Sequence, residues 1–354
     1  HLSIRRQRQM CIRDRTMWSG FDVDLSSTVT VVEGIRSKLG GRARVEYAQG
    51  VQIRKQFSSM FEAILGGKRP APWTADQADA EFAKAVDLAR RSDLIVLALG
   101  EAALMSGELA SQSSLDLPGR QRELLDAVVA LGKPVILVLI NGRPLNITWA
   151  VGRVPAILEA WHPGNEGGNA IADLLFGDAN PGGKLPVSWP RDAGQIPVYY
   201  AHNLTHQPET APGFTSRYWD QPSTPLYPFG YGLSYTRFAF SNLQVRPERV
   251  KMGAAVEVTV EVANTGSRAG DEVVQLYIHQ QYGRASRPVR ELKGFERVSL
   301  AAGEKKTVRF SLGKNELSYW SAQAKTWVQD ATSFDLWAGS DSTAALHTKF
   351  QIIQ

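Results

Sequence analysis

Two patterns of apolar residues divide the chain. From Trp18 to about Pro190, short continuous runs of Val, Ile and Leu alternate with segments that have apolar residues at helical spacing. Continuous apolar strands separated by helices are typical of a parallel sheet covered on both faces. The predicted strands are 43–50, 93–100, 133–140 and 156–161, and the predicted helices are 27–40, 74–92, 119–132 and 165–177. The first pattern therefore predicts an α/β sandwich with a mainly parallel sheet.

The second pattern begins at about residue 244, where apolar and polar residues alternate with a period of two. Several short alternating segments separated by turn residues predict an antiparallel β-sandwich. The predicted strands are 254–266, 271–280, 290–300, 304–312, 332–339 and 347–353. We expect an α/β domain over 18–190, an aromatic and Pro-rich connector over 191–243, and a β-sandwich domain over 244–354.

The first 17 residues differ from the rest of the chain. Residues 1–15 contain five arginines and one aspartate, and they account for +4 of the net charge of +5. They have no hydrophobic periodicity and no apolar signal-peptide core. We expect residues 1–17 to be a non-native or disordered leader. The remainder is nearly neutral, so a nucleic-acid partner is not expected.

Several other classes of function are disfavoured by the composition. The sole cysteine, Cys11, lies in the leader, so neither a disulfide framework nor a thiolate metal site is expected. The six histidines are scattered, and only His202 and His206 are close in sequence, so no metal site is expected. No apolar run approaches the roughly 18 residues that a membrane span needs. The G-x-x-x-x-G-K-[ST] phosphate loop is absent.

Two glutamates follow the predicted strand 93–100, in the stretch "LALGEAALMSGELASQ". Ligands usually bind at the carboxyl ends of parallel strands, so Glu101 and Glu108 are candidate site residues. Glycosidases need a carboxylic acid beside the glycosidic oxygen and a second carboxylate about 5–5.5 Å away in retaining enzymes. Loop glutamates are also commonly just solvated. The residues alone leave open a catalytic pair, one catalyst with a structural neighbour, or solvated charges.

Three longer segments resemble glycoside hydrolase family 3, and most of all its bacterial periplasmic β-glucosidases. They are "LALGEAALMSGELASQSSLDLPGRQRELLDAV", "AWHPGNEGGNAIADLLFGDANPGGKLPVSWPRDAGQIPVYY" and "SRYWDQPSTPLYPFGYGLSYTRF". The resemblance runs from about Trp18 to the C-terminus. It implies a barrel with an aspartate nucleophile, then an α/β sandwich domain that supplies the acid/base glutamate, and finally a fibronectin type III-like domain.

The resemblance also implies roles for single residues. The S-G-E position of the acid/base glutamate falls on Glu108, whereas Glu101 ends the strand and is expected to hydrogen-bond loop backbone. Close relatives tend to carry an arginine where this chain has Gln112, which removes a cation that could bind the loop or lower a carboxyl pKa. No barrel, no nucleophile and no first sandwich strand is recognised. The chain is thus expected to be a C-terminal fragment that is inactive alone.

The whole protein is expected to be a retaining, exo-acting β-glucosidase that acts on β-glucosides or oligosaccharides, needs no cofactor, and is periplasmic or secreted. The alternative is a non-catalytic carbohydrate-binding or scaffold module, in which the β-sandwich and exposed aromatic residues would carry the function. An upstream reading frame that encodes a barrel with the nucleophile would favour the enzyme.

Other motif residues have two interpretations each. Asn141, Gly142 and Arg143 follow the strand 133–140 and either face a substrate cleft or form a glycine turn with a capping Asn. Glu166 precedes a helix core, where a carboxylate favours the positive end of the helix dipole, so we expect a cap. A set of aromatic residues is expected to pack a domain junction rather than stack on sugars: Tyr218, Trp219, Tyr227, Phe229, Tyr231 and Tyr235.

Overall fold

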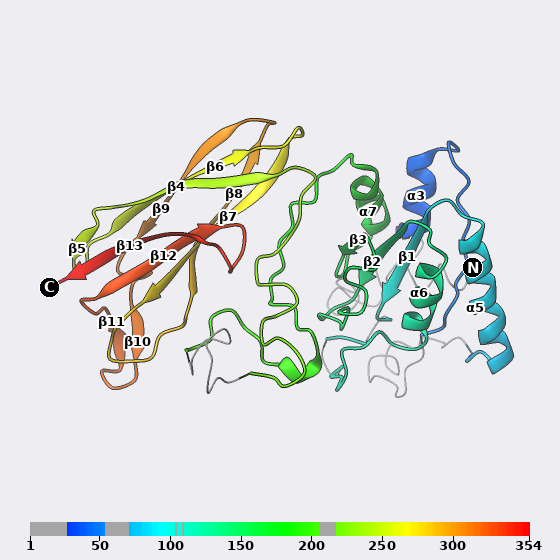
Figure 1. Ribbon diagram of the computed structural model, residues 1–354, viewed down its shortest axis with the longest axis horizontal. Coiled ribbons are helices and arrows are strands. Elements are labelled where there is room, and N and C mark those ends of the chain that lie inside the picture. Colours follow the sequence, from blue (N-terminus) through cyan, green and yellow to red (C-terminus); the bar gives the residue numbers. More distant parts are fainter. Residues whose placement is uncertain (1–26, 54–70, 103–104, 108–109, 205–216) are drawn as a thin grey trace. The chain divides into compact units, whose positions relative to one another are not determined.

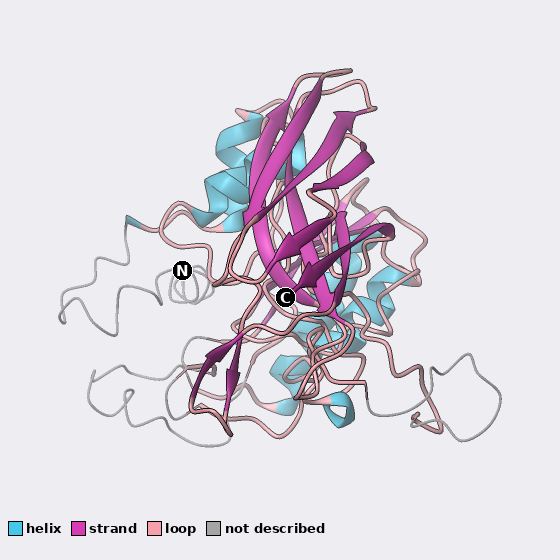
Figure 2. Cartoon of the chain, turned by 90° about the vertical axis from the view of Figure 1, so that its left-hand side faces the viewer, coloured by secondary structure: helices cyan, strands magenta, loops and turns pink. Residues whose placement is uncertain are grey.

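The computed structural model describes residues 27–53, 71–102, 105–107, 110–204 and 217–354, and it divides into two compact units (Figure 1). The first, which we call the α/β unit, runs up to Ala179 and includes Arg191–Gly194. The second, the β unit, consists of Asn180–Pro190 and Gln195–Gln354. Among the described residues, the α-helices all lie in the α/β unit and strands β4 to β13 all lie in the β unit. Figure 2 distinguishes the helices from the strands by colour.

The α/β unit is built on a three-stranded parallel sheet in the order β1-β2-β3. Its strands are β1 (Ile95–Gly100), β2 (Val135–Ile140) and β3 (Ala156–Glu159). Leu137, Val138 and Leu139 of the central strand are completely buried. Because successive side chains of a strand point to opposite faces, this burial requires cover on both sides of the sheet. The predicted parallel α/β sandwich is confirmed.

The helices of this unit form where the sequence predicts them. They are α3 (Val31–Leu39), α5 (Ala75–Arg90), α6 (Gln121–Val129) and α7 (Gly167–Phe176). Thr30 and Thr74 each close a capping box at the start of α3 and α5. Apolar residues of α3 and α7 pack with one face of the sheet in a common core that includes Val31, Val138 and Ile171.

The predicted strand at 43–50 is wrong, because this described segment belongs to no helix or strand. The carbonyl oxygen of Val45 accepts hydrogen bonds from Nε and Nη2 of Arg36, at 3.4 and 3.2 Å, instead of from a neighbouring strand. Valine and tyrosine favour extended structure, but they form a strand only where a partner backbone lies alongside.

Helices α3 and α7 approach each other closely because each presents a glycine at the contact. A Cβ on Gly34 would lie 2.0 Å from the carbonyl oxygen of Gly168, and a Cβ on Gly168 would lie 2.1 Å from that of Thr30. Both obstacles are backbone atoms, so no rotamer change relieves them. The contact places the N-terminus of α7 against the residues that precede α3.

The β unit contains the predicted β-sandwich. One sheet has the order β5-β13-β12-β7-β8, the other has the order β4-β6-β9, and β10 and β11 form a separate hairpin. The pairs are antiparallel except for β5 with β13. The strands are β4 (Phe238–Arg246), β5 (Arg249–Lys251), β6 (Val256–Asn264), β7 (Gly270–Gln280), β8 (Glu291–Leu300), β9 (Lys305–Leu312), β10 (Tyr319–Ser321), β11 (Thr326–Val328), β12 (Ser333–Gly339) and β13 (Leu346–Ile353).

The core of the β unit explains the period of two in its sequence. Alternate residues of β6, from Val256 to Val262, are buried together with Leu276 and Leu336 from the other sheet. The six predicted strands are confirmed. Strand β4 begins at Phe238, within the range that the sequence analysis assigned to the connector.

Candidate active site

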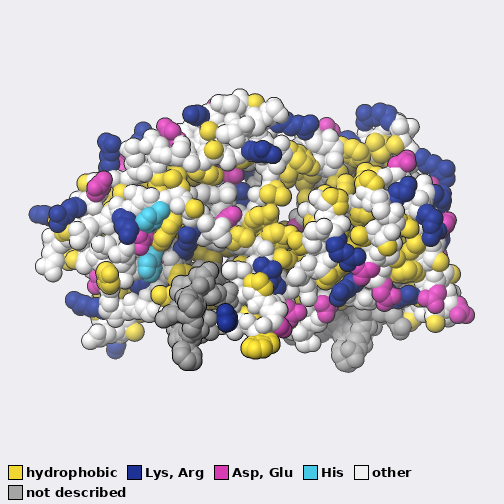
Figure 3. All heavy atoms as spheres, viewed as in Figure 1, with side chains coloured by type: hydrophobic (Ala, Val, Ile, Leu, Met, Phe, Trp, Pro, Cys, Tyr) yellow, Lys and Arg dark blue, Asp and Glu magenta, His cyan; other side chains and the backbone are white. Residues whose placement is uncertain are grey.

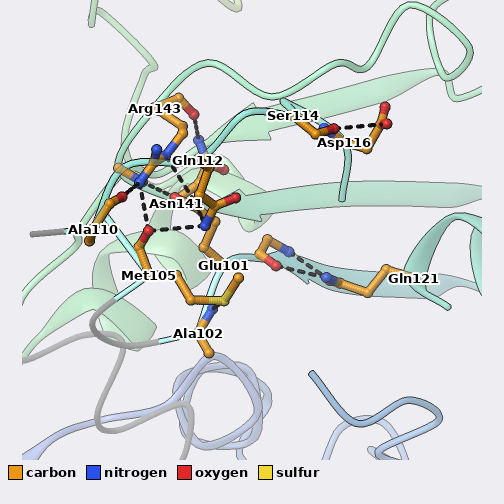
Figure 4. A network of polar contacts seen from close by, with 12 residues as sticks. Glu101, Ala102, Met105, Ala110, Gln112, Ser114, Asp116, Gln121, Asn141 and Arg143 are labelled. Carbon is orange, nitrogen blue, oxygen red and sulfur yellow. Dashed lines mark hydrogen bonds and ion pairs between the residues drawn. The ribbon is translucent and has the colours of Figure 1, made fainter. Parts of the chain in front are cut away.

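The candidate site lies where the three parallel strands end. Strand β1 is followed by Glu101, strand β2 by Asn141 to Arg143, and strand β3 ends on Glu159. Parallel strands bring these ends to one edge of the sheet, so residues about 20 to 60 positions apart in sequence meet there. Figure 4 shows the resulting network of polar contacts.

Glu101 is buried, with 3% of its surface exposed, and both of its carboxylate oxygens are occupied. Its Oε2 accepts a hydrogen bond from the backbone N–H of Gly142 at 3.1 Å. Its Oε1 lies 3.0 Å from Nε of Arg143 and accepts a hydrogen bond from Nε2 of Gln112 at 3.2 Å. The expectation that Glu101 bonds loop backbone is met by its contact with Gly142, and the ion pair with Arg143 adds to it.

Arg143 connects the loop after β2 with the loop after β1 (Figure 4). Its Nη2 donates to the carbonyl oxygens of Met105 at 2.6 Å and Ala110 at 2.8 Å. Gln112 also donates to the carbonyl oxygen of Met105, at 3.0 Å. We call Glu101, Gln112 and Arg143 the clasp, because together they join both ends of the segment 105–110 to the sheet edge.

The clasp shows how the loop is held although position 112 is a glutamine and not the arginine that the family resemblance implies. Arg143 supplies a cation beside Glu101, and it binds loop carbonyls together with the Gln112 amide. Although Gln112 is neutral, this part of the loop therefore still has a cation, supplied by Arg143, and hydrogen-bond donors from both side chains.

The described part of the S-G-E motif consists of Ser106 and Gly107. Ser106 is buried, and Gly107 has a φ of 115°, a conformation that favours glycine. A Cβ on Gly142 would lie 2.0 Å from Oγ of Ser106 and 2.6 Å from Nε2 of His162, so glycine is needed for the two loops to meet. Glu108 itself lies outside the described residues, and its assignment as the acid stays a prediction.

The exit of β1 is held by Gln121, which the sequence analysis did not single out. Its side-chain Oε1 accepts from the N–H of Gly100 at 2.8 Å, and its Nε2 donates to the carbonyl oxygen of Gly100 at 2.7 Å. Gly100 needs to be a glycine, since its φ is 141° and a Cβ would lie 2.0 Å from the carbonyl oxygen of Ile140. A glutamine on the apolar face of a predicted helix, beside Leu124 and Leu125, is the signal that could have identified it.

Glu159 is a third carboxyl group at the sheet edge, and the sequence analysis missed it as well. It accepts hydrogen bonds from the N–H of Trp161 at 2.8 Å and from Nδ2 of Asn141 at 3.3 Å. The pKa of Glu159 is raised from 4.5 to about 8, chiefly by burial and also by the nearby Glu101 carboxylate, against the lowering effect of the two hydrogen bonds. The rule that identified Glu101, a carboxylate directly after a predicted strand, missed Glu159 because the predicted strand 156–161 runs two residues past the observed end of β3.

Asn141 belongs to a turn. Its side chain is completely buried, and Nδ2 donates to the carbonyl oxygen of Arg143 at 2.9 Å. This bond closes the turn through a side-chain N–H and a backbone carbonyl, whereas a capping asparagine accepts from a backbone N–H through Oδ1. The expected turn at 141–143 is therefore present, but Asn141 does not make the expected capping bond, and the turn presents the Arg143 side chain to the β1 loop.

Glu166 occupies the N-cap position of α7 but makes no side-chain cap hydrogen bond. Its Oε2 instead accepts from Nδ2 of Asn169 at 2.7 Å. Glu166 thus lies at the expected cap position, but the expected cap hydrogen bond to the helix backbone is not made, because the side-chain amide of Asn169 binds the carboxylate.

Aromatic residues of the former connector range pack inside the β unit. Tyr227 stacks on Tyr231 with ring centroids 4.8 Å apart, and Phe229 stacks on Tyr200 at 4.5 Å. Trp219, by contrast, is fully exposed. Two others are more than a third exposed, namely Tyr218 and Tyr235.

The charged side chains and the histidines of the described residues were predicted to form neither a nucleic-acid face nor a metal site. On the face shown in Figure 3, Lys and Arg side chains are interspersed with Asp and Glu. Within the described ranges, no group of three or more His, Cys, Asp or Glu residues could hold a metal ion, and no helix is long and apolar enough to cross a membrane. Of the two neighbouring histidines, His202 contacts the Asn203 carbonyl through Nδ1 at 3.1 Å, and His206 lies outside the described residues.

Two domain families match the sequence. The glycosyl hydrolase family 3 C-terminal domain matches residues 13–235, and the fibronectin type III-like domain matches residues 272–342. The chain is 40% identical over 344 residues to a periplasmic beta-glucosidase of Salmonella typhimurium, which covers 95% of this chain and 44% of that protein. It is 39% identical over 316 residues to a beta-xylosidase of Formosa agariphila, which covers 89% of this chain and 40% of that protein.

Solved structures show the same similarity. A β-glucosidase from Erythrobacter marinus superposes with a TM-score of 0.82 at 35% identity, covering 92% of this chain and 43% of that one. A beta-glucosidase from Listeria innocua in complex with gluconolactone has a TM-score of 0.81 at 33% identity, covering 94% and 43% of the two chains. The chain thus spans less than half the length of these relatives.

Proposed function

Since the chain belongs to glycosyl hydrolase family 3, we propose that it supplies the acid/base glutamate, Glu108, of a retaining, exo-acting β-glucosidase. The observation that most supports this proposal is the loop after β1, which the clasp binds at Met105 and Ala110 and in which Gly107, at φ 115°, immediately precedes Glu108. Relatives named as β-glucosidases match nearly the whole chain, while two relatives from Formosa agariphila are named a beta-xylosidase and a putative beta-xylosidase. That the hydrolysed sugar is glucose is therefore part of the proposal.

In the proposed reaction, an aspartate of a barrel domain outside this chain attacks the anomeric carbon. Glu108 donates its proton to the glycosidic oxygen, so that the aglycone leaves as an alcohol and a glycosyl-enzyme forms. Glu108 then removes a proton from water, which attacks the same carbon and releases glucose and the aspartate. The two carboxyl groups suffice for this double displacement, and no cofactor is implied.

Glu101 is a poor alternative for the acid. Its oxygens are already bonded to Gly142, Gln112 and Arg143, and only 3% of its surface is exposed. A substrate oxygen could reach this carboxyl only after the clasp opened. The contacts of Glu101 therefore favour a role in holding the loop.

The cellular location follows from the same family relation. The Salmonella relative is named a periplasmic beta-glucosidase. We place the intact protein in the periplasm or outside the cell, where β-linked oligosaccharides would reach it.

The test is Glu108→Ala in the protein expressed from its complete gene. Activity on a disaccharide should fall by about 10²–10⁴-fold, because an alkoxide leaves poorly without a proton. A dinitrophenyl glycoside should retain more activity, and azide should partly restore turnover by replacing activated water. The control is Glu123→Ala, which replaces an exposed glutamate of α6 and should leave the activity on both substrates unchanged. Unchanged disaccharide hydrolysis by the Glu108 variant would remove the proposal, and glucan binding without hydrolysis would favour a binding module.

A further inference from the structure

We propose that the clasp residues Glu101, Gln112 and Arg143 are positioning residues that hold Glu108 in place for acid/base catalysis. This inference rests on the function proposed above, and it assigns to the clasp the positioning of the acid/base residue. None of the three side chains needs to touch the substrate. Their contribution acts through the placement of the loop.

The clasp bonds fall on both sides of Glu108 in the sequence. Nη2 of Arg143 binds the carbonyl oxygens of Met105 and Ala110, which lie on either side of Glu108. A single nitrogen therefore joins the two ends of a six-residue segment, 105–110. Gln112 adds a second bond to Met105.

The backbone bonds of the described loop residues do not replace this attachment. The N–H of Met105 donates to Ala102 at 3.1 Å, and that of Ala110 donates to Gly107 at 3.2 Å. These short-range bonds set the curvature of the loop, but they do not fix it against the sheet. Arg143 does so, because it follows β2 and is held at the sheet edge by Glu101.

The chemistry of arginine suits this role. A guanidinium presents several N–H donors in a fixed planar fork, whereas a lysine ammonium is a compact point charge. Arg143 uses Nε toward Glu101 and Nη2 toward the two carbonyl oxygens at the same time. The Glu101 carboxylate neutralises the guanidinium in a site where the side chains are only 2% and 20% exposed.

Kinetics on the protein expressed from its complete gene give the first test. A catalytic group displaced by about 1 Å can lose on the order of 10²-fold in rate, so Arg143→Gln should lower kcat/KM on a disaccharide by about 10- to 100-fold. The dinitrophenyl glycoside needs little proton assistance, and its kcat/KM should fall by less than about threefold. Arg143→Lys should behave like Arg143→Gln, since it keeps the charge but not the fork. Arg153→Gln, an exposed arginine paired with Asp126, is the control and should match the parent protein.

A double-mutant cycle separates action through Glu108 from a general structural effect. In the Glu108→Ala background, Arg143→Gln should change disaccharide kcat/KM by less than about threefold, because the group that it positions is gone. Equal losses on both substrates, a full Arg143 effect without Glu108, or wild-type behaviour of Arg143→Lys would each overturn the inference.

Hydrogen exchange of the peptide 101–112, measured by mass spectrometry, tests the clasp without any activity. Arg143→Gln and Gln112→Ala should both speed exchange there, while Arg153→Gln should not. Gln112→Ala keeps the ion pair intact, so it remains informative if Arg143→Gln fails to fold. Unchanged exchange in Gln112→Ala and any folded Arg143 variant would refute the clasp. If exchange rises but Glu108→Ala hydrolyses the disaccharide normally, the clasp stands while the proposed function and the positioning role both fail.

Discussion

Replacing Glu101 by glutamine tests how much the buried ion pair contributes to the stability of the α/β unit. The carboxylate accepts hydrogen bonds from Gly142 and Gln112 and forms an ion pair with Arg143, so three N–H groups face it. A glutamine keeps one oxygen and turns the other into an NH₂ group, which must face at least one of these donors. The Arg143 guanidinium also loses its countercharge.

The expected loss follows from burial. Removing one partner of a buried ion pair typically costs about 3–5 kcal/mol, since it leaves an uncompensated charge. The Glu101 side chain is 2% exposed, which favours a large effect, while Arg143 is 20% exposed and keeps its two carbonyl acceptors, which favours the lower end. For a unit of this size, a loss of about 3 kcal/mol lowers Tm by roughly 6–12 °C.

The measurement is thermal unfolding followed by circular dichroism at a helix wavelength. Because the described α-helices all lie in the α/β unit, this signal reports on that unit. Asp126→Asn is the matched control, since it neutralises an acid whose partner Arg153 is 44% exposed and should change stability by less than about 1 kcal/mol. If the Glu101→Gln variant has the same Tm as the Asp126→Asn control, the buried ion pair contributes little to stability and the estimate from burial is wrong.

Three further predictions follow from other parts of the molecule. The raised pKa of Glu159, about 8, means that the folded state binds the proton of this carboxyl more tightly than the unfolded state does. Its contribution to the free energy of unfolding is therefore complete below about pH 4.5 and disappears as the pH rises through 8. Glu159→Gln should reduce the fall in stability with pH, measured as Tm in thermal melts between pH 5 and 9. Gly168→Ala should destabilise the α/β unit by about 1–3 kcal/mol or more, because its methyl group would lie 2.1 Å from the Thr30 carbonyl oxygen, whereas Gly194→Ala, which meets only a side-chain atom at 3.7 Å, should be nearly neutral in the same melts. The purified chain alone should show no hydrolysis of aryl β-glucosides, since it is expected to hold the acid without the nucleophile; robust turnover that Glu108→Gln abolishes would contradict this.

Local sequence was sufficient for most of the secondary structure. The capping boxes at Thr30 and Thr74 depend on residues three positions apart, so helices α3 and α5 could be predicted from short stretches. The alternation of Val256 to Val262 likewise predicts a strand with one buried face. The segment 43–50 failed because a strand also needs a partner, which no local pattern supplies.

The site itself shows the same division. The sequence by itself determined that Glu101 and Glu108 follow a strand whose carboxyl end lies at a ligand-binding edge. Only the tertiary structure decided that Arg143, 42 positions after Glu101, pairs with it, and that Glu159 lies nearby with a raised pKa. The physical reason is that an ion pair or a shifted pKa depends on distance and burial, and these arise only when separate strands are aligned in one sheet.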